Sequence, residues 1–213
     1  ETHLMKNSEW GAVAYLTQSK YGRNGIEITV NSKNLKGTPS KIYAETGYGN
    51  GADDTYNTEN GQLASTTGNL YGIYDINGGT WERTAMYLNN DHNNLLANGK
   101  PMVDLDNDGK IDKISNKYIS IYNVGTTDES LDNYNESINK KRIGEALWES
   151  SRTGNSSNGS WFSDYSSFSY VFYPFMVRGG YYDGNTEAGA FAFYGADGSA
   201  RVHYGFRAVI SGY

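Results

Sequence analysis

The sequence contains no cysteine among its 213 residues. That absence excludes a disulfide framework, zinc sites built on thiolates and thiol catalysis. The sequence also has no stretch that reaches the roughly 20 apolar residues needed to cross a bilayer as a helix. A chain without cysteine is compatible both with the cytosol and with surface proteins that avoid disulfides, so this feature leaves the compartment open.

Basic residues are outnumbered, with 18 Lys and Arg against 24 Asp and Glu and a net charge of −6. No long run of Lys and Arg occurs in the sequence. Binding to a phosphate backbone requires a basic patch. We therefore expect no nucleic-acid partner and no direct contact with an anionic membrane.

The motifs of common enzyme classes are also missing: there is no nucleophile motif, no phosphate-binding loop and no metal-binding pair of histidines. The three histidines, His3, His92 and His203, are scattered along the chain. A hydrolase could use two carboxylates, with His203 as a base. The candidate carboxylates are Asp183, Glu187 and Asp197. We predict that the chain is not an enzyme and keep a hydrolase as the least favoured alternative.

Aromatic residues and glycine are abundant, with 19 Tyr, 7 Phe, 4 Trp and 26 Gly. Tyrosine buries a large ring and still presents a hydroxyl to water. A chain rich in Tyr, Gly, Asn and Ser has the composition of adaptable binding surfaces. The length fits one large domain better than two.

Helical spacing predicts a first helix over residues 7–20, capped by Asn7 or Ser8 with Trp10 on its buried side, and a second helix over residues 139–150. Residues 89–117 have the composition of an insertion. Strands are predicted at 26–30, at the end of 69–88, and at 118–124, 176–178, 188–194 and 201–210. A helix, a loop-rich middle and terminal antiparallel strands define the α+β class.

The sharpest local pattern is Asp104-Leu-Asp106-Asn-Asp108-Gly109-Lys110-Ile111-Asp112. Aspartates at alternate positions followed by glycine let a loop fold around one hard cation, and the carbonyl of Lys110 and the carboxylate of Asp112 fall at further ligand positions. We therefore predict a structural Ca²⁺ site in the insertion.

The calcium pattern departs from the usual loop at its twelfth position, which is Ser115 rather than a bidentate glutamate. Another carboxylate is then expected to complete the shell. Asp128 and Glu129 are candidates only because they follow closely in the sequence.

Four further motifs occur in order along the chain: Leu4-Met-Lys-Asn-Ser-Glu-Trp10, Gly72-Ile-Tyr-Asp-Ile-Asn-Gly-Gly-Thr-Trp-Glu82, Arg178-Gly-Gly180 and Gly205-Phe-Arg207. This series resembles the formylglycine-generating-enzyme branch of the C-type-lectin fold. Members of that branch show Leu-Pro-Thr-Glu-Ala-Glu-Trp, Tyr-Asp-Met-x-Gly-Asn-Val-Trp-Glu, Arg-Gly-Gly-Ser-Trp and Gly-Phe-Arg. The first helix and the Arg-Gly-Gly-Tyr-Tyr stretch are still more similar to lectin-like domains of Gram-positive pilin-like and surface proteins. The same fold carries the variable binding face of diversity-generating retroelement proteins.

The resemblance implies one domain over residues 1–213, with two helices packed on short twisted antiparallel sheets, many loops and chain ends that lie close together. The sequence departs from the enzyme branch because it lacks the cysteines that those enzymes use for copper binding and catalysis. Sulfatase-modifying activity is therefore not expected. Sugar-binding lectins of the fold use a Glu-Pro-Asn or Gln-Pro-Asp loop around calcium. None of Pro39, Pro101 and Pro174 lies in such a loop, so calcium-bridged sugar binding is not expected either.

The charged and aromatic residues of these motifs have a structural interpretation. We expect Arg178 and Arg207 to be structural arginines satisfied by carboxylates or carbonyls, because an unpaired buried guanidinium is costly. Asp75 and Glu82 are expected to be their partners, with metal binding as the alternative. Apolar rings at these spacings usually pack in a core. The rings expected there are Trp10, Tyr74, Trp81 and Phe206.

We predict an extracellular or cell-surface binding module, adhesin-like or pilin-like, whose signal or anchor lies outside this sequence. Its partner would be a protein or glycan on another cell or surface, or other pilus subunits. The ligand surface implied by the resemblance lies between the Arg178-Gly-Gly and Gly-Phe-Arg207 motifs, with Arg201 and His203 on the exposed strand face and Phe206 on the buried one. Its candidate residues are Tyr182, Asp183, Asn185, Tyr194, Arg201 and His203. The alternative is a structural subunit of a pilus or phage particle without a ligand of its own.

Overall fold

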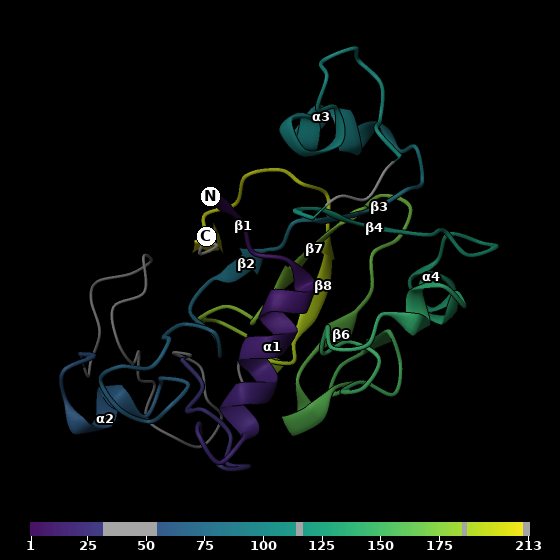
Figure 1. The fold of residues 1–213 in the computed structure, drawn as a ribbon. Coiled ribbons are helices and arrows are strands. Elements are labelled where there is room, and N and C mark those ends of the chain that lie inside the picture. Colours follow the sequence, from purple (N-terminus) through teal and green to yellow (C-terminus); the bar gives the residue numbers. More distant parts are fainter. Residues whose placement is uncertain (32–54, 114–116, 185–186, 211–213) are drawn as a thin grey trace.

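The computed structural model describes residues 1–31, 55–113, 117–184 and 187–210, and these form a mixed α+β structure (Figure 1). The helices are α1 (Asn7–Gln18), α2 (Glu59–Gln62), α3 (Asn93–Val103) and α4 (Ser130–Asn135), with short 3-10 turns η1 (Asn139–Lys141) and η2 (Trp161–Ser163). The strands are β1 (Thr2–Leu4), β2 (Trp81–Arg83), β3 (Met86–Leu88), β4 (Ser120–Tyr122), β5 (Asn155–Ser156), β6 (Ser166–Ser167), β7 (Phe175–Arg178), β8 (Phe193–Ala196), β9 (Tyr204–Phe206) and β10 (Ala208–Ile210). The predicted α+β class is confirmed.

The main sheet within the described residues has the strand order β5-β6-β8-β7-β2-β9. β7 pairs antiparallel with both β8 and β2, but β2–β9 and β6–β8 are parallel pairs. β3 and β4 form a separate parallel pair. The expectation of purely antiparallel sheets is therefore wrong, because connections through long loops let distant segments align in the same direction.

β7 is the centre of the structure, since all four of its residues are buried. Val177 packs with Tyr87 and with Leu95 of α3 on one side of the sheet. Met176 packs with Tyr122 and Phe168 on the other. Alternate residues of a strand point to opposite faces, so this strand joins two parts of the hydrophobic core.

Helix α1 confirms the first predicted helix, with the expected start at Asn7 and an end at Gln18 instead of Lys20. Its first turn is closed by the Glu9 carboxylate, which accepts the Lys6 backbone N–H at 2.8 Å. Asn7, the predicted cap, is instead fully buried and donates to the Tyr122 hydroxyl at 3.0 Å. Trp10 is also buried, so the face expected to pack does so.

The second predicted helix, over residues 139–150, is wrong beyond its first turn. Only Asn139–Lys141 is helical, as η1, and the chain then turns through Gly144 and Ala146, whose φ values are +93° and +51°. This turn fits closely against α1, because a Cβ on Gly11 would lie 2.0 Å from the Gly144 carbonyl oxygen. The close approach leaves no room for a side chain at residue 11, so glycine is required there.

This turn supplies backbone carbonyls that accept hydrogen bonds from the side chain of Arg178. The guanidinium is fully buried and donates to the carbonyls of Ala192 at 3.1 Å, Glu145 at 3.0 Å and Ala146 at 2.9 Å. It also donates to the Asn7 side-chain oxygen of α1 at 3.3 Å. The structural role predicted for Arg178 is confirmed, with carbonyls as its main partners.

The end of the chain also differs from the single strand predicted over residues 201–210. It divides into β9, which pairs parallel with β2, and β10, which pairs antiparallel with β1. Thr2 is the register partner of Ile210, the last residue that the structure describes. Within the described residues, the start and the end of the chain therefore lie close together, as expected. Phe206 is 71% exposed, so its expected core position is wrong.

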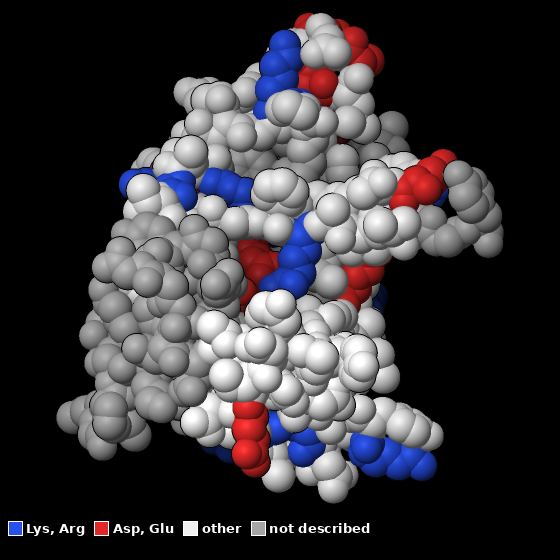
Figure 2. All heavy atoms as spheres, turned by 90° about the vertical axis from the view of Figure 1, so that its left-hand side faces the viewer, with Lys and Arg blue, Asp and Glu red and all other residues white. Residues whose placement is uncertain are grey.

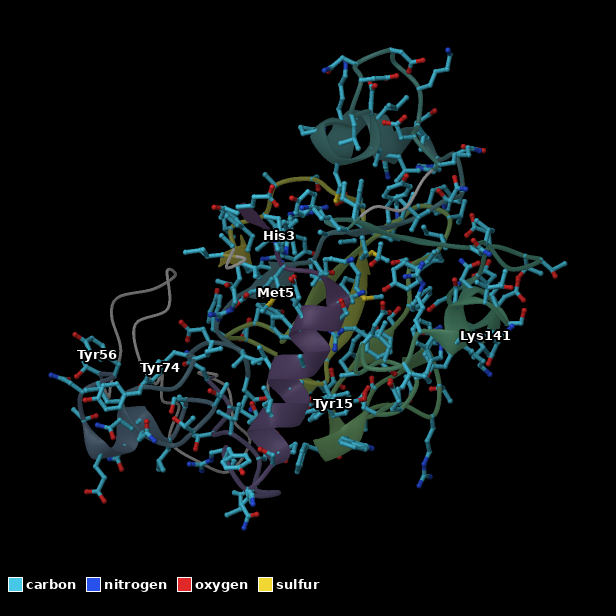
Figure 3. The ribbon with its side chains drawn as sticks, in the orientation of Figure 1. His3, Met5, Tyr15, Tyr56, Tyr74 and Lys141 are labelled. Carbon is cyan, nitrogen blue, oxygen red and sulfur yellow. The ribbon has the colours of Figure 1, made fainter. Side chains whose placement is uncertain are left out.

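Three further expectations about individual segments differ from the structure. Residues 26–30 form no strand, and Ile26 is exposed while Ile28 is buried. Residues 188–192 are buried but precede β8 rather than belonging to it. Tyr74 lies at the surface beside Tyr56, where the ring centroids are 6.5 Å apart, and not in the core (Figure 3).

The predicted insertion, residues 89–117, contains a helix that the pattern did not indicate. α3 carries a kink at Gly99 and has Pro101 inside it, and both residues usually break helices. It packs closely on the sheet because a Cβ on Gly99 would lie 2.3 Å from the Phe175 ring. α3 and the loop after it stand at the top of Figure 1. In the part of the chain that the structure describes, no helix is both long and apolar enough to cross a membrane.

Arg178→Met keeps a similar volume but leaves the carbonyls of Ala192, Glu145 and Ala146 without their donor. Unsatisfied buried carbonyls are costly, so we expect the free energy of unfolding to fall by about 3 kcal/mol or more. Urea titration measures this change, with Arg152→Met at an exposed site as the control. Equal stability of the two variants would contradict the role assigned to Arg178.

Candidate functional site

The aspartates of the insertion form a three-carboxylate group. Asp104, Asp106 and Asp108 each place one ligand oxygen within 4.8 Å of the others. Asp104 is buried, and its Oδ1 has no hydrogen-bond partner among the described residues. An unsatisfied buried carboxylate oxygen is costly, and like charges held together raise that cost. The group therefore has the chemistry of a site that could hold a metal ion.

Local hydrogen bonds hold this loop in shape. The Asp104 carboxylate accepts the Gly109 N–H at 3.1 Å, and Gly109 itself has a φ of +83° that favours glycine. Asp112 accepts the Leu105 N–H at 2.7 Å, which ties the two ends of the loop together. The sharp turn predicted at the glycine is present.

The other residues predicted for the metal shell have contacts of their own. The Lys110 ammonium contacts Asp108 at 2.9 Å, and this hydrogen bond lowers the pKa of the Asp108 carboxyl. Asp112 is not among the three grouped carboxylates that the described residues form. Asp128 accepts hydrogen bonds from Asn90 and Asn133 and is not among the grouped carboxylates, and Ser115 lies outside the described residues.

The position of the loop is exposed. It occupies the tip of the molecule, where Figure 2 shows acidic and basic side chains next to each other. Lys100 also lies near, with its ammonium 3.6 Å from Asp104. A cation would therefore compete with two lysine ammonium groups for the same carboxylates.

A second candidate site is an open cavity of about 210 Å³ beside β2 and β8. Four aromatic side chains form most of its wall, together with one carboxylate and three small residues. The lining residues are Trp81, Tyr165, Gly180, Tyr181, Gly184, Glu187, Ala188 and Tyr194. We call this cavity the aromatic pocket.

The rings of the aromatic pocket meet around Tyr194. Its centroid lies 6.0 Å from that of Trp81, with planes inclined at 35°, and 5.8 Å from that of Tyr165, at 69°. Tyr181 adds a fourth ring. The rings are therefore inclined to one another and not stacked in parallel.

The Arg-Gly-Gly turn positions one side of this pocket. Gly179 and Gly180 have φ values of +89° and +77°. A Cβ on Gly180 would lie 2.4 Å from the Cβ of Ala188, so only glycine lets the chain before β8 approach this closely. Tyr181 follows directly and enters the pocket wall.

The predicted ligand residues are partly brought together by this arrangement. Tyr194 lines the pocket. Tyr182 stacks edge-on against Tyr181 at 5.8 Å, and burial together with the charge of Asp183 raises the pKa of Tyr181. Asn185 lies outside the described residues.

The two remaining candidates stand beside the pocket rather than in its wall. The His203 ring lies 5.0 Å from that of Tyr181, and burial followed by the charge of Arg201 lowers the pKa of His203. Arg201 is exposed and pairs with Asp197 at 3.1 Å. The exposed position predicted for Arg201 is confirmed, whereas His203 is half-buried.

The sequence did not indicate two of the aromatic residues that line the pocket. Trp81 was expected only in the core and is buried, but its ring also borders the cavity. Tyr165 comes from a segment that no motif marked. Tyr181 lies in the predicted ligand segment, where an aromatic pair directly follows Arg178-Gly-Gly.

An ion pair links β2 to the residue between β9 and β10. The Arg207 guanidinium lies 2.6 Å from the Glu82 carboxylate, which confirms the predicted pairing of these motifs. Burial raises the pKa of Glu82 to about 7, and that of Asp75 to about 6, against the opposing effect of Arg207. Asp75 accepts the Asn31 amide at 2.7 Å, so its hydrogen-bond partner is an amide and not the expected arginine, whereas Glu82 has the expected partner.

A larger cavity of about 420 Å³ lies elsewhere, between β1, α3 and the start of β7. Its wall includes Leu4, Met102, Ile119 and Phe175 and holds no carboxylate among the described residues. No predicted site residue lines it.

No protein family matches the sequence, and a comparison with curated proteins finds no match. The function is therefore inferred from the chemistry of the two sites.

Glu82→Gln should flatten the pH dependence of stability. Glu82 and Asp75 have ordinary pKa values of 4.5 and 3.8 and folded values of about 7 and about 6, so the folded state holds protons that the unfolded chain has released. Their contribution to stability falls as the pH rises from about 4 to about 7. Melting temperatures across this range should fall less steeply in Glu82→Gln than in the unmodified protein. The exposed Glu129→Gln is the control, and an unchanged slope in Glu82→Gln would refute the assignment.

Proposed function

We propose that this chain is a binding module of an extracellular or cell-surface protein, and that its ligand occupies the aromatic pocket. The observation that carries the proposal is the placement of four aromatic rings around an open cavity beside the Arg178-Gly-Gly turn. Concave sites lined by aromatic residues with a few polar groups are the usual form of ligand pockets. The ligand would be part of a protein or glycan on another surface.

We further propose that the fold is C-type-lectin-like, in the formylglycine-generating-enzyme branch. Two observations support it. The motif strands β2, β7 and β9 lie in one sheet, where Glu82 is the register partner of both Arg178 and Gly205. The first and last strands also pair with each other.

A structural subunit of a pilus or phage particle remains the alternative function, in which the aromatic pocket would contact a neighbouring subunit. The hydrolase receives no support from geometry in the described residues. Asp197 accepts hydrogen bonds from the Ser199 side chain and from Arg201, and of the three candidate carboxylates only Glu187 lines the pocket.

Binding should depend on the side chains beside the pocket. The double substitution Arg201→Ala with His203→Ala removes an exposed charge and the ring that packs on Tyr181. We expect attachment to the ligand found on a glycan and protein array, screened with calcium present, to weaken by about fivefold or more. The melting temperature should change little, because surface substitutions usually alter stability by about 0.5 kcal/mol or less.

The control for that measurement is Arg152→Ala, which removes an exposed arginine from another loop. Loss of folding in the double variant would assign Arg201 and His203 to structure. Unchanged attachment by a folded double variant would refute the proposed binding face.

We propose Ca²⁺ as the metal of the three-aspartate group, with a structural role. Carboxylate and carbonyl oxygens are the ligands that calcium prefers. The loop supplies three carboxylates from one short turn, and the buried Asp104 Oδ1 has no hydrogen-bond partner among the described residues. A bound ion would stabilise the tip of the insertion.

Calcium should therefore raise stability. At a calcium concentration of 100 times Kd the free energy of unfolding should rise by about 2.7 kcal/mol relative to protein with a chelator. Asp106→Asn should remove most of this increment, since it removes one ligand charge. Asp91→Asn, which breaks only an exposed pair with Lys113, should retain it. An equal melting temperature with calcium and with chelator would refute the site.

A further inference from the structure

The chemistry of the aromatic pocket narrows the class of ligand. Among the described residues that line it, Glu187 is the one charged side chain, and no Lys, Arg or His belongs to the wall. The remaining polar side-chain groups of the wall are tyrosine hydroxyls and the Trp81 indole N–H. Electron-rich ring faces and a carboxylate all attract positive charge.

The ring geometry suits a compact positive group. The ring centroids of Trp81 and Tyr165 lie 6.0 and 5.8 Å from that of Tyr194, and their planes are inclined to it by 35° and 69°. Several ring surfaces therefore border one volume. A cation within about 6 Å of a ring centroid is attracted by the ring quadrupole, and Trp is the best partner.

The size of the cavity also limits the occupant. Its volume of about 210 Å³ is below the range of roughly 300–1,000 Å³ typical of pockets for drug-sized ligands. It accommodates one head group better than an extended peptide or an oligosaccharide. A sugar would in addition need several donors and acceptors to pair its hydroxyls, and this wall is mainly aromatic.

Basic groups near the pocket have partners of their own. Arg201 pairs with Asp197 at 3.1 Å. Arg83 lies over the Tyr204 ring at 5.1 Å. Burial and then the charge of Arg201 lower the pKa of His203, which disfavours the cationic form of that ring. Repulsion of a bound cation by these neighbours is therefore reduced.

We propose that the aromatic pocket binds an organic ammonium group, quaternary or methylated, through cation–π contacts with its four rings and ion pairing with Glu187. The inference rests on the proposed binding function and specifies the chemistry of its ligand. The ammonium group would be carried by the protein or glycan on the partner surface.

Choline and its neutral isostere 3,3-dimethylbutanol test this inference, since they share a shape and differ in charge. Calorimetry and saturation-transfer NMR on the full chain should show choline binding, with the isostere weaker by about tenfold. Equal affinity for both probes would show that the pocket recognises shape alone and would overturn the inference.

Two variants separate the contributions of charge and of ring. Glu187→Gln should weaken choline several-fold and leave the isostere unchanged. Tyr181→Leu keeps an apolar wall, and it should weaken choline more than the isostere. Glu129→Gln, on the exposed start of α4, is the matched control and should bind choline as the unmodified protein does. Melting curves establish that each variant is folded.

Binding of choline and binding of an array ligand together distinguish a wrong ligand class from a wrong binding function. If choline does not bind but an array ligand does, and Tyr181→Leu abolishes attachment of that ligand, the cation inference is wrong and the binding function stands. If neither choline nor any array ligand responds to Tyr181→Leu, both proposals are wrong.

Discussion

The structure depends on one buried positive charge that receives no direct carboxylate partner among the described contacts. The guanidinium of Arg178 instead gathers carbonyls from two separate turns and a side-chain oxygen from α1. Its ring neighbours, Trp10 and Phe193, lie 5.6 and 5.9 Å from it and add cation–π attraction. Because burial without partners would be prohibitive, the turn at Gly144 and the approach of α1 are tied to this residue. The Arg-Gly-Gly stretch then leads directly from the core to Tyr181 in the pocket wall.

The residues that could be predicted are those whose chemistry leaves few options. The stripe of α1, the structural role of Arg178, the Glu82–Arg207 pair and the clustering of Asp104, Asp106 and Asp108 all follow from local patterns. These are groups that need partners, so their surroundings are constrained by charge and burial. Local sequence patterns were therefore sufficient to predict the surroundings of these residues.

The expectations that were wrong depended on tertiary contacts. Residues 139–150 have helical spacing, but carbonyls of that segment are needed by Arg178, and so the chain turns. α3 contains Gly99 and Pro101, yet the tight contact of Gly99 with Phe175 stabilises it. The aromatic pocket draws its walls from segments far apart in the sequence, and only packing brings Trp81, Tyr165 and Tyr194 together.

The pairing of β1 with β10 has a mechanical consequence. Thr2 is opposite Ile210 in this antiparallel pair, so the two strands connect to the ends of the chain at the same end of the ribbon. Tension applied to the two ends would load its hydrogen bonds one pair at a time, as in unzipping, instead of sharing the load among them. Under a pulling force the ribbon would peel open first, while the strands that carry the aromatic pocket would stay unloaded until it had separated.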